Sequence, residues 1–256
     1  MTKKNVIKIL IFSFVLLMIM AGIANDQIRQ QGIADKKDAV PNNSFIGEKI
    51  VYSVKLGAID LGSAVFTRMQ NSELNGKEVN KMTFETRLAR FRDTETIYSD
   101  LASFLPVRIV RDINTWPSKE NIVEDYDQKN FVLTITKSKG RTKEEWQITK
   151  SQSIQNAILL PFSIRQVPGL KPGWNIMVQL PGQAYKIILD SIEELNLPAG
   201  KFEAYHFVSQ PPHFQIWVST DSRRIPLKIR GAGVLRYTLV FKEYSLDNHL
   251  KNKGNQ

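Results

Sequence analysis

Apolar and polar residues alternate along most of the chain beyond residue 45, with the period of two that is typical of half-buried β-strands. In the first such run, residues 48–57, the side chains of Ile50, Tyr52, Val54 and Leu56 fall on one face. Similar runs occupy residues 63–69, 77–88, 94–99, 107–113, 121–127, 131–137, 144–149, 174–180, 185–195, 201–209, 214–219, 225–231 and 234–245. So many short strands predict a mostly β, antiparallel domain, built as a sandwich, a barrel or a strongly curved sheet.

Turn signals separate these runs. The strongest is Asn75-Gly76, because both residue types tolerate the positive φ angles of a two-residue hairpin turn. Other turns or bulges are predicted at Gly57, Asp60 and Gly62, at residues 127–130, and at residues 138–140. The strands should therefore follow one another as hairpins.

One segment, residues 151–173, departs from the two-residue period. Ile154, Ala157, Ile158 and Phe162 recur near helical spacing, and Ser151 or Ser153 could cap the first turn. Pro161 would sit within this helix or end its first part, and Pro168 and Pro172 close the segment. The sequence predicts one principal helix near residues 154–165, which would cover one opening or face of the sheet.

The N-terminus has the pattern of an export signal. Lys3, Lys4 and Lys8 precede an apolar run at residues 9–24, and no acidic residue occurs before Asp26. The predicted organisation is a signal peptide or N-terminal anchor at residues 1–24, a flexible linker at 25–44, a single β-rich domain at 45–244 and a polar tail at 245–256. The expected location is the periplasm, where the protein is either soluble after signal cleavage or tethered to the inner membrane.

The absence of cysteine and the net positive charge limit the functions that the chain can have. The chain has no cysteine, which excludes disulfides, thiol chemistry and lipid attachment to a cysteine after the signal. Its net charge is +10, or +7 without the three signal lysines, an excess that could favour anionic lipid headgroups or acidic faces of partner proteins. The alternative is a solvated surface whose charge aids solubility. Nucleic acid is not an expected partner, because no recognition motif accompanies the charge.

No catalytic constellation is visible. The three histidines, His206, His213 and His249, have no metal-ligand spacing, and no strained nucleophile elbow or phosphate-binding loop occurs. Adjacent acidic pairs such as Glu193-Glu194 would point to opposite faces of a strand. We therefore expect no catalytic residues, no metal site, no cofactor and no enzymatic activity.

Aromatic residues on separate predicted strands give the clearest indication of a candidate binding site. In a closed sandwich they would only fill the core, whereas in an incompletely sealed barrel some would line an apolar cavity. The candidate ligand-binding residues are Phe84, Tyr98, Trp146, Tyr185 and Trp217.

Several segments together resemble a known family. These are GEKIVYSVKLGAIDLGSA at residues 47–64, NAILLPFSIRQVPGLKPGW at 156–174, LPAGKFEAYHF at 197–207, IWVSTDSRRIPLKIR at 216–230 and GVLRYTLV at 233–240. In this order they are similar to the domain-of-unknown-function 3108 family of Gram-negative envelope proteins. The resemblance implies a curved half-barrel similar to periplasmic lipoprotein carriers, and it supplies no activity and no catalytic residues.

These observations predict an exported binding or carrier protein for a lipid, lipoprotein or other hydrophobic envelope component. The alternative is a non-catalytic scaffold or interaction module without an internal ligand. The expected partners are a lipid or other hydrophobic ligand, an envelope protein or an anionic membrane surface. A continuous apolar cavity would favour the carrier, and a filled core would favour the scaffold.

The export signal can be tested directly. Residues 1–31 fused to a reporter that works only outside the cytoplasm should give activity, because the charged and apolar regions together direct secretion. Replacing Leu16 and Leu17 with arginine should abolish that activity. Unchanged reporter activity would contradict the prediction, and N-terminal sequencing of the mature protein would distinguish cleavage after Ala24 from a retained anchor.

Overall fold

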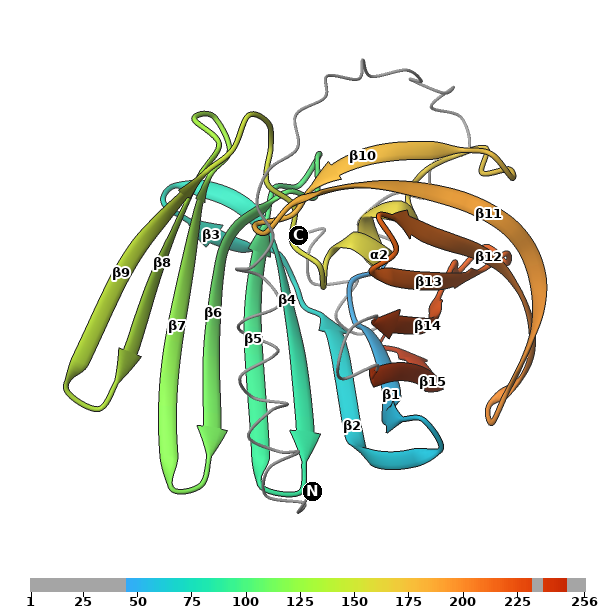
Figure 1. The fold of residues 1–256 in the computed structure, drawn as a ribbon, viewed down its shortest axis with the longest axis horizontal. Coiled ribbons are helices and arrows are strands. Elements are labelled where there is room, and N and C mark those ends of the chain that lie inside the picture. The colour runs from blue at the N-terminus through green and yellow to red at the C-terminus, as the bar shows by residue number, and fades with distance from the viewer. Residues whose placement is uncertain (1–44, 232–236, 248–256) are drawn as a thin grey trace.

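The computed structural model describes residues 45–231 and 237–247 (Figure 1). The predicted signal or anchor, the linker and residues 248–256 of the predicted tail lie outside the described residues. Within the described part, the chain folds into one antiparallel sheet and one short helix, which confirms the predicted fold class. None of the described helices is long and apolar enough to cross a membrane.

The sheet contains fifteen strands. They are β1 (Glu48–Leu56), β2 (Ile59–Arg68), β3 (Ser72–Leu74), β4 (Lys77–Leu88), β5 (Phe91–Ser99), β6 (Pro106–Thr115), β7 (Ser118–Asp127), β8 (Val132–Lys139), β9 (Thr142–Thr149), β10 (Asn175–Gln179), β11 (Ala184–Leu197), β12 (Gly200–Gln210), β13 (Phe214–Ser219), β14 (Pro226–Gly231) and β15 (Tyr237–Leu246). β15 extends two residues into the predicted tail.

The strand order places both ends of the described chain in the middle of the sheet. The first half of the sheet runs from β1 through β2 and β4 to the edge strand β9. The second half begins at the opposite edge strand, β10, and ends at β15, which pairs with β1. The two edge strands do not pair with each other, so the sheet is an open half-barrel. Figure 1 shows the two halves facing each other, with the helix between them.

Glycine is required at one hairpin turn and at one close contact between strands, both at positions where the sequence predicts a turn or bulge. Asn75 and Gly76 have φ angles of 53° and 74° in the β3–β4 turn, the left-handed conformation that this dipeptide tolerates. Gly62 has a φ of 151°, and a Cβ there would lie 2.1 Å from the carbonyl oxygen of Arg87 on β4. Only glycine therefore allows this close approach of β2 to β4.

The segment between β9 and β10, residues 150–174, crosses the interior of the half-barrel and joins two hydrophobic cores. In the first core, Phe162 stacks on Phe66 of β2 with ring centroids 3.7 Å apart. In the second core, Leu160 and Ile164 pack against residues of β10 to β13. We call residues 150–174 the crossing segment.

The helix in this segment, α2 (Leu160–Ile164), is shorter than the sequence predicts, and it is not capped by Ser151 or Ser153. Instead, the Asn156 side chain accepts hydrogen bonds from the backbone N–H groups of Ile158 and Leu159. Ile154 forms a parallel bridge with Gln179 of β10. Because tertiary hydrogen bonds engage the start of the segment, helix forms only in the turn that contains Pro161.

A buried ion pair attaches the crossing segment to the centre of the sheet. Arg165 and Glu48 of β1 are both almost fully buried, and they form a bidentate pair with N–O distances of 2.7 and 2.9 Å. Phe45 lies over the guanidinium group at 3.7 Å, and the backbone carbonyl of Arg223 accepts a further hydrogen bond. These contacts replace the hydration that the two charged groups lose on burial.

The variant Glu48→Gln should destabilise the protein strongly, because it leaves the Arg165 charge buried without its partner. We expect the free energy of unfolding to fall by about 3 kcal/mol or more in urea denaturation. Glu194→Gln is the matched control, since its pair with Lys201 is exposed and should contribute less than about 1 kcal/mol. Equal losses in the two variants would contradict the anchoring role of the buried pair.

Candidate functional site

The candidate site lies on the face of β4–β9 that packs against the crossing segment, which we call the inner face. Cross-strand register defines it, because directly paired residues share a face. One row across the strands runs from Ile97 through Ile109, Glu124 and Ile135 to Trp146. The isoleucines of this row belong to the first core. Charged and apolar side chains thus share one buried surface.

Four charged residues on the inner face are buried. Asp93 and Glu95 on β5, Arg111 on β6 and Glu124 on β7 expose 3%, 4%, 6% and 8% of their surface. Arg111 donates a hydrogen bond to Asp93 Oδ2, and its Nε lies 3.4 Å from Glu95 Oε1. Tyr126 donates a 2.6 Å hydrogen bond to Glu124. We call Asp93, Glu95, Arg111 and Glu124 the inner charged cluster.

Three carboxyl groups share one guanidinium group in this cluster, so they cannot all carry a charge at low cost. Burial raises the pKa of Glu95 to about 8, because the pairing with Arg111 offsets desolvation only in part. Burial also raises the pKa values of Asp93 and Glu124, again against the attraction of Arg111. Glu95 therefore holds a proton near neutral pH.

Asp93 keeps unused hydrogen-bonding capacity. Its Oδ2 accepts from Arg111, but its Oδ1 is buried and has no hydrogen-bond partner among the residues that the structure describes. A buried acceptor without a donor is costly, and a ligand that brings a donor would remove that cost. The described residues contain no cluster of His, Cys, Asp or Glu arranged to hold a metal ion.

The structure brings together three of the five candidate residues in the first core. Phe84 is buried on the inner face of β4, and it pairs across the strands with Glu95 of the charged cluster. Trp146 lies on the inner face of the edge strand β9 and is only partly buried. Trp217 reaches the same core from β13, in the other half of the sheet.

The other two candidate residues lie elsewhere. Tyr185 belongs to the second core, where its ring meets Phe214 edge-on. Tyr98 follows Ile97 on β5 and therefore points to the face opposite the inner face, where the Lys81 ammonium lies 6.0 Å from its ring. The five aromatic residues thus do not line one common site.

Trp217 also belongs to a row of polar contacts across β11–β14, which we call the polar ladder and which includes Glu193, His206 and Lys228. His206 stacks on its indole at 4.4 Å, and the Lys228 ammonium lies 4.4 Å from the ring. Its Nε1 donates a 2.5 Å hydrogen bond to Glu193. Beside this ladder is a hollow of about 220 Å³ with mostly polar walls, lined by Ile192, Glu193, Glu194, Lys201, Phe202 and Glu203. His206 is accordingly a packed strand residue.

Sequence reasoning missed the inner charged cluster, although part of its signal is local. Asp93 and Glu95 alternate in phase with Ile97, so the two carboxylates share a face with a core isoleucine. Arg111 alternates in the same way with its apolar neighbours on β6. Acidic residues two positions apart share one face of a strand, whereas adjacent acidic residues point to opposite faces.

The cluster predicts a fall in stability as pH rises. In the unfolded chain the Glu95 carboxyl has its ordinary pKa of 4.5, whereas in the folded protein burial raises that pKa to about 8. Between these values the folded state binds more protons, so the free energy of unfolding should decrease as pH rises from about 4.5 to 8. Glu95→Gln should reduce this slope in urea denaturation measured across that range.

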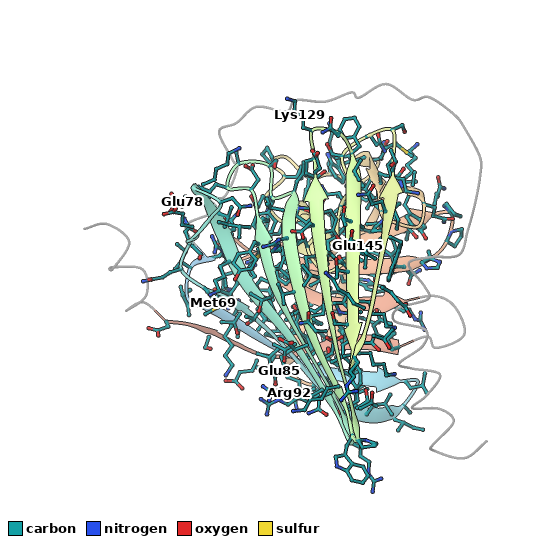
Figure 2. All side chains as sticks on the ribbon, turned by 90° about the vertical axis from the view of Figure 1, so that its left-hand side faces the viewer. Met69, Glu78, Glu85, Arg92, Lys129 and Glu145 are labelled. Atoms are coloured by element: carbon teal, nitrogen blue, oxygen red, sulfur yellow. The ribbon has the colours of Figure 1, made fainter. Side chains whose placement is uncertain are left out.

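Glu145→Gln provides the matched control for this measurement. Glu145 is exposed on β9 and points away from the inner face in Figure 2. Its replacement should leave the pH slope unchanged. A slope that is the same in the wild-type protein and in Glu95→Gln would show that Glu95 does not titrate in this range.

Comparison with known proteins gives a family but no activity, and no curated protein matches the chain. Among solved structures, a β-barrel-like protein of domain of unknown function DUF1849 from Brucella abortus is 8% identical, with a TM-score of 0.49, over 80% of this chain and 99% of that chain. A second structure, from Bacteroides fragilis NCTC 9343, is described as a candidate exported protein with a YmcC-like fold. It is 9% identical, with a TM-score of 0.27, and the match covers 78% of this chain and 96% of that chain. The family described as "Protein of unknown function (DUF3108)" matches residues 51–240, which is most of the chain. The chain therefore belongs to the DUF3108 family.

Proposed function

We propose that this chain is an exported, non-catalytic binding or carrier protein for a lipid, lipoprotein or other hydrophobic component of the cell envelope. The observation that carries the proposal is the inner face of an unclosed sheet, where core aromatic residues adjoin buried carboxyl groups. Binding sites for amphiphiles combine a mostly apolar wall with a few polar groups that fix the head of the ligand. The inner face offers both.

The apolar part of the ligand would enter at the edge of the inner face on β9. Trp146 and Ile148 on this strand are only partly buried, although they pack against the first core. β9 is an edge of the sheet, so none of the strands in residues 45–231 and 237–247 covers them on that side. A hydrocarbon chain laid along β9 would bury their remaining apolar surface, at roughly 25 cal/mol per Å².

The polar head would be held by the inner charged cluster. Trp146 and Glu124 lie in the same cross-strand row, separated by Ile135 of β8. Because three carboxyl groups face one guanidinium group and Asp93 Oδ1 lacks a donor, the cluster favours a head that donates hydrogen bonds or carries positive charge. An amine head fits this requirement better than a carboxylate head.

A second candidate function, an interaction module without an internal ligand, is supported by the packing of the interior. The Phe66–Phe162 stack occupies the space between the sheet and the crossing segment. The hollow beside Glu193 measures about 220 Å³, below the roughly 300 Å³ of small-molecule sites, and its walls are mostly polar. The titration below distinguishes the two functions.

For the location, we propose the periplasm, either as a soluble protein after cleavage of residues 1–24 or tethered to the inner membrane by them. The proposal rests on the charged and apolar pattern of the N-terminus. The lack of cysteine is compatible with export, because a domain of this size can build its own core.

Titration with single-chain amphiphiles tests the binding function. Fatty alcohols of increasing length should bind with increasing affinity, by up to about 0.8 kcal/mol for each buried methylene. Alkylamines should bind more tightly than fatty acids of the same length, and Asp93→Asn should reduce this difference. Tryptophan fluorescence reports binding, and co-purified lipid can be identified by mass spectrometry after organic extraction.

Trp146→Ala should weaken binding, whereas Ile176→Ala is the matched control, because Ile176 lies exposed on β10, at the opposite edge of the sheet. Retained circular dichroism would show that both variants fold. If no chain length binds below millimolar concentration and no lipid co-purifies, the carrier function is wrong and the interaction module takes its place.

A further inference from the structure

Four hairpin turns lie side by side at one end of the sheet. They connect β1 to β2, β4 to β5, β6 to β7 and β8 to β9, and they form the lower end of the sheet in Figure 1. Neighbouring strands are about 4.8 Å apart, so the turns of these eight adjacent strands form a row roughly 35 Å long. We call residues 56–59, 87–92, 114–119 and 139–143 the hairpin rim.

The hairpin rim contains the two most exposed large hydrophobic residues of the described chain. Trp116, in the β6–β7 turn, is 74% exposed, and Ile59, beside the β1–β2 turn, is 63% exposed. Neither side chain contributes to the two hydrophobic cores. Single exposed apolar residues are common, but here two of them lie along the same row of turns.

The hairpin rim is also strongly basic. Residues 87–92, 114–119 and 139–143 contain no acidic residue. Their cationic side chains are Arg87, Arg90, Arg92, Lys119, Lys139, Arg141 and Lys143. Glu85 pairs with two of them and Glu120 with a third. Across residues 45–231 and 237–247, Arg90, Lys119, Arg141 and Lys143 take part in no ion pair, so their charge is available to a partner.

The opposite end of the sheet has a different character. Its turns contain Asn75-Gly76, Asp100 and residues 127–130, in which Asp127 balances Lys129. Both aspartates accept hydrogen bonds from backbone N–H groups of their own turns. None of the strongly exposed hydrophobic residues of the described chain lies in these turns. Figure 2 shows this polarity, with Lys129 at one end of the sheet and Arg92 at the other.

We propose that the hairpin rim docks on an anionic phospholipid bilayer. Trp116 and Ile59 would enter the interfacial layer, where tryptophan is enriched in membrane proteins. The unpaired arginine and lysine side chains would contact lipid phosphates, and each basic residue near an anionic surface adds a similar increment of binding. Two weak signals, one apolar and one electrostatic, together give stable attachment to a membrane.

Docking in this orientation would place the strands end-on to the membrane and leave the inner face and the edges β9 and β10 accessible from the side. The proposal does not depend on the proposed function, because the hairpin rim shares no residue with the inner charged cluster. It also concerns a surface other than the N-terminal apolar segment, which is itself expected to bind lipid. A test must therefore report on the rim and not on binding of the whole chain.

The absence of cysteine makes such a test possible, because one introduced cysteine can carry a single label. An environment-sensitive fluorophore on Ala89→Cys probes the hairpin rim, and the same fluorophore on Lys129→Cys probes the opposite end. The full chain is mixed with vesicles of phosphatidylglycerol and phosphatidylcholine, or of phosphatidylcholine alone. We expect the rim label to brighten on the anionic vesicles only, with the effect suppressed by high salt, and the label at position 129 to stay unchanged.

Variants in the Ala89→Cys background identify the contacts. Arg90→Gln and Arg141→Gln should each lower the docking constant about fivefold. Trp116→Ser should also lower it, whereas Lys129→Gln, which removes the same charge at the other end, should have no effect. All these positions are exposed, and circular dichroism checks that each variant folds. An equal response on neutral vesicles, an equal response of the two labels, or no loss in Arg90→Gln and Arg141→Gln would overturn the proposal.

Discussion

An antiparallel sheet that does not close must fill its own interior, and in this protein a single stretch of chain does so. The two edge strands, β9 and β10, are consecutive in sequence but lie at opposite ends of the strand order. The chain therefore has to cross from one edge to the other, and it crosses through the space that the sheet encloses. The buried Glu48–Arg165 pair attaches this segment to β1, the strand that joins the two halves. The first and second cores, and hence the relation between the halves, depend on this attachment.

The inner charged cluster adds a second constraint. Burying three carboxyl groups around one arginine lowers stability relative to an apolar core of the same shape. The charged cluster nevertheless lies among phenylalanine and isoleucine residues of the first core, where apolar side chains would also fit. A hydrogen-bond acceptor left free on Asp93 gives this surface a capacity for binding that an apolar core lacks. The proposed head-group site follows from that capacity.

The inner face and the hairpin rim are separate surfaces with different chemistry. The inner charged cluster has three carboxyl groups and one arginine, while three of the four rim turns contain basic residues and no acidic ones. A protein docked through its rim would hold the open edge of the half-barrel close to the bilayer without covering it. A ligand with an amine head and a hydrocarbon chain could then pass between the membrane and β9 over a short distance. The two proposals are thus compatible, although each stands on its own observations.

Local patterns in the sequence specify the strands, most of the turns and the face on which each strand residue lies. Apolar and polar residues alternate with the two-residue period of a strand, which puts Tyr98 on the face opposite Ile97 and Asp93 on the same face as Ile97. Which residues of different strands come into contact follows from the tertiary structure and not from these patterns. The shared arginine of the cluster comes from a neighbouring strand, and Glu48 meets Arg165 across 117 residues. The tertiary structure also limits the helix to five residues, because the backbone N–H groups at the start of the crossing segment donate hydrogen bonds to Gln128 and Gln179 instead. Local periodicity fixes the face on which each strand residue lies. Its neighbours on other strands are fixed by register and long-range pairing, which no local pattern encodes.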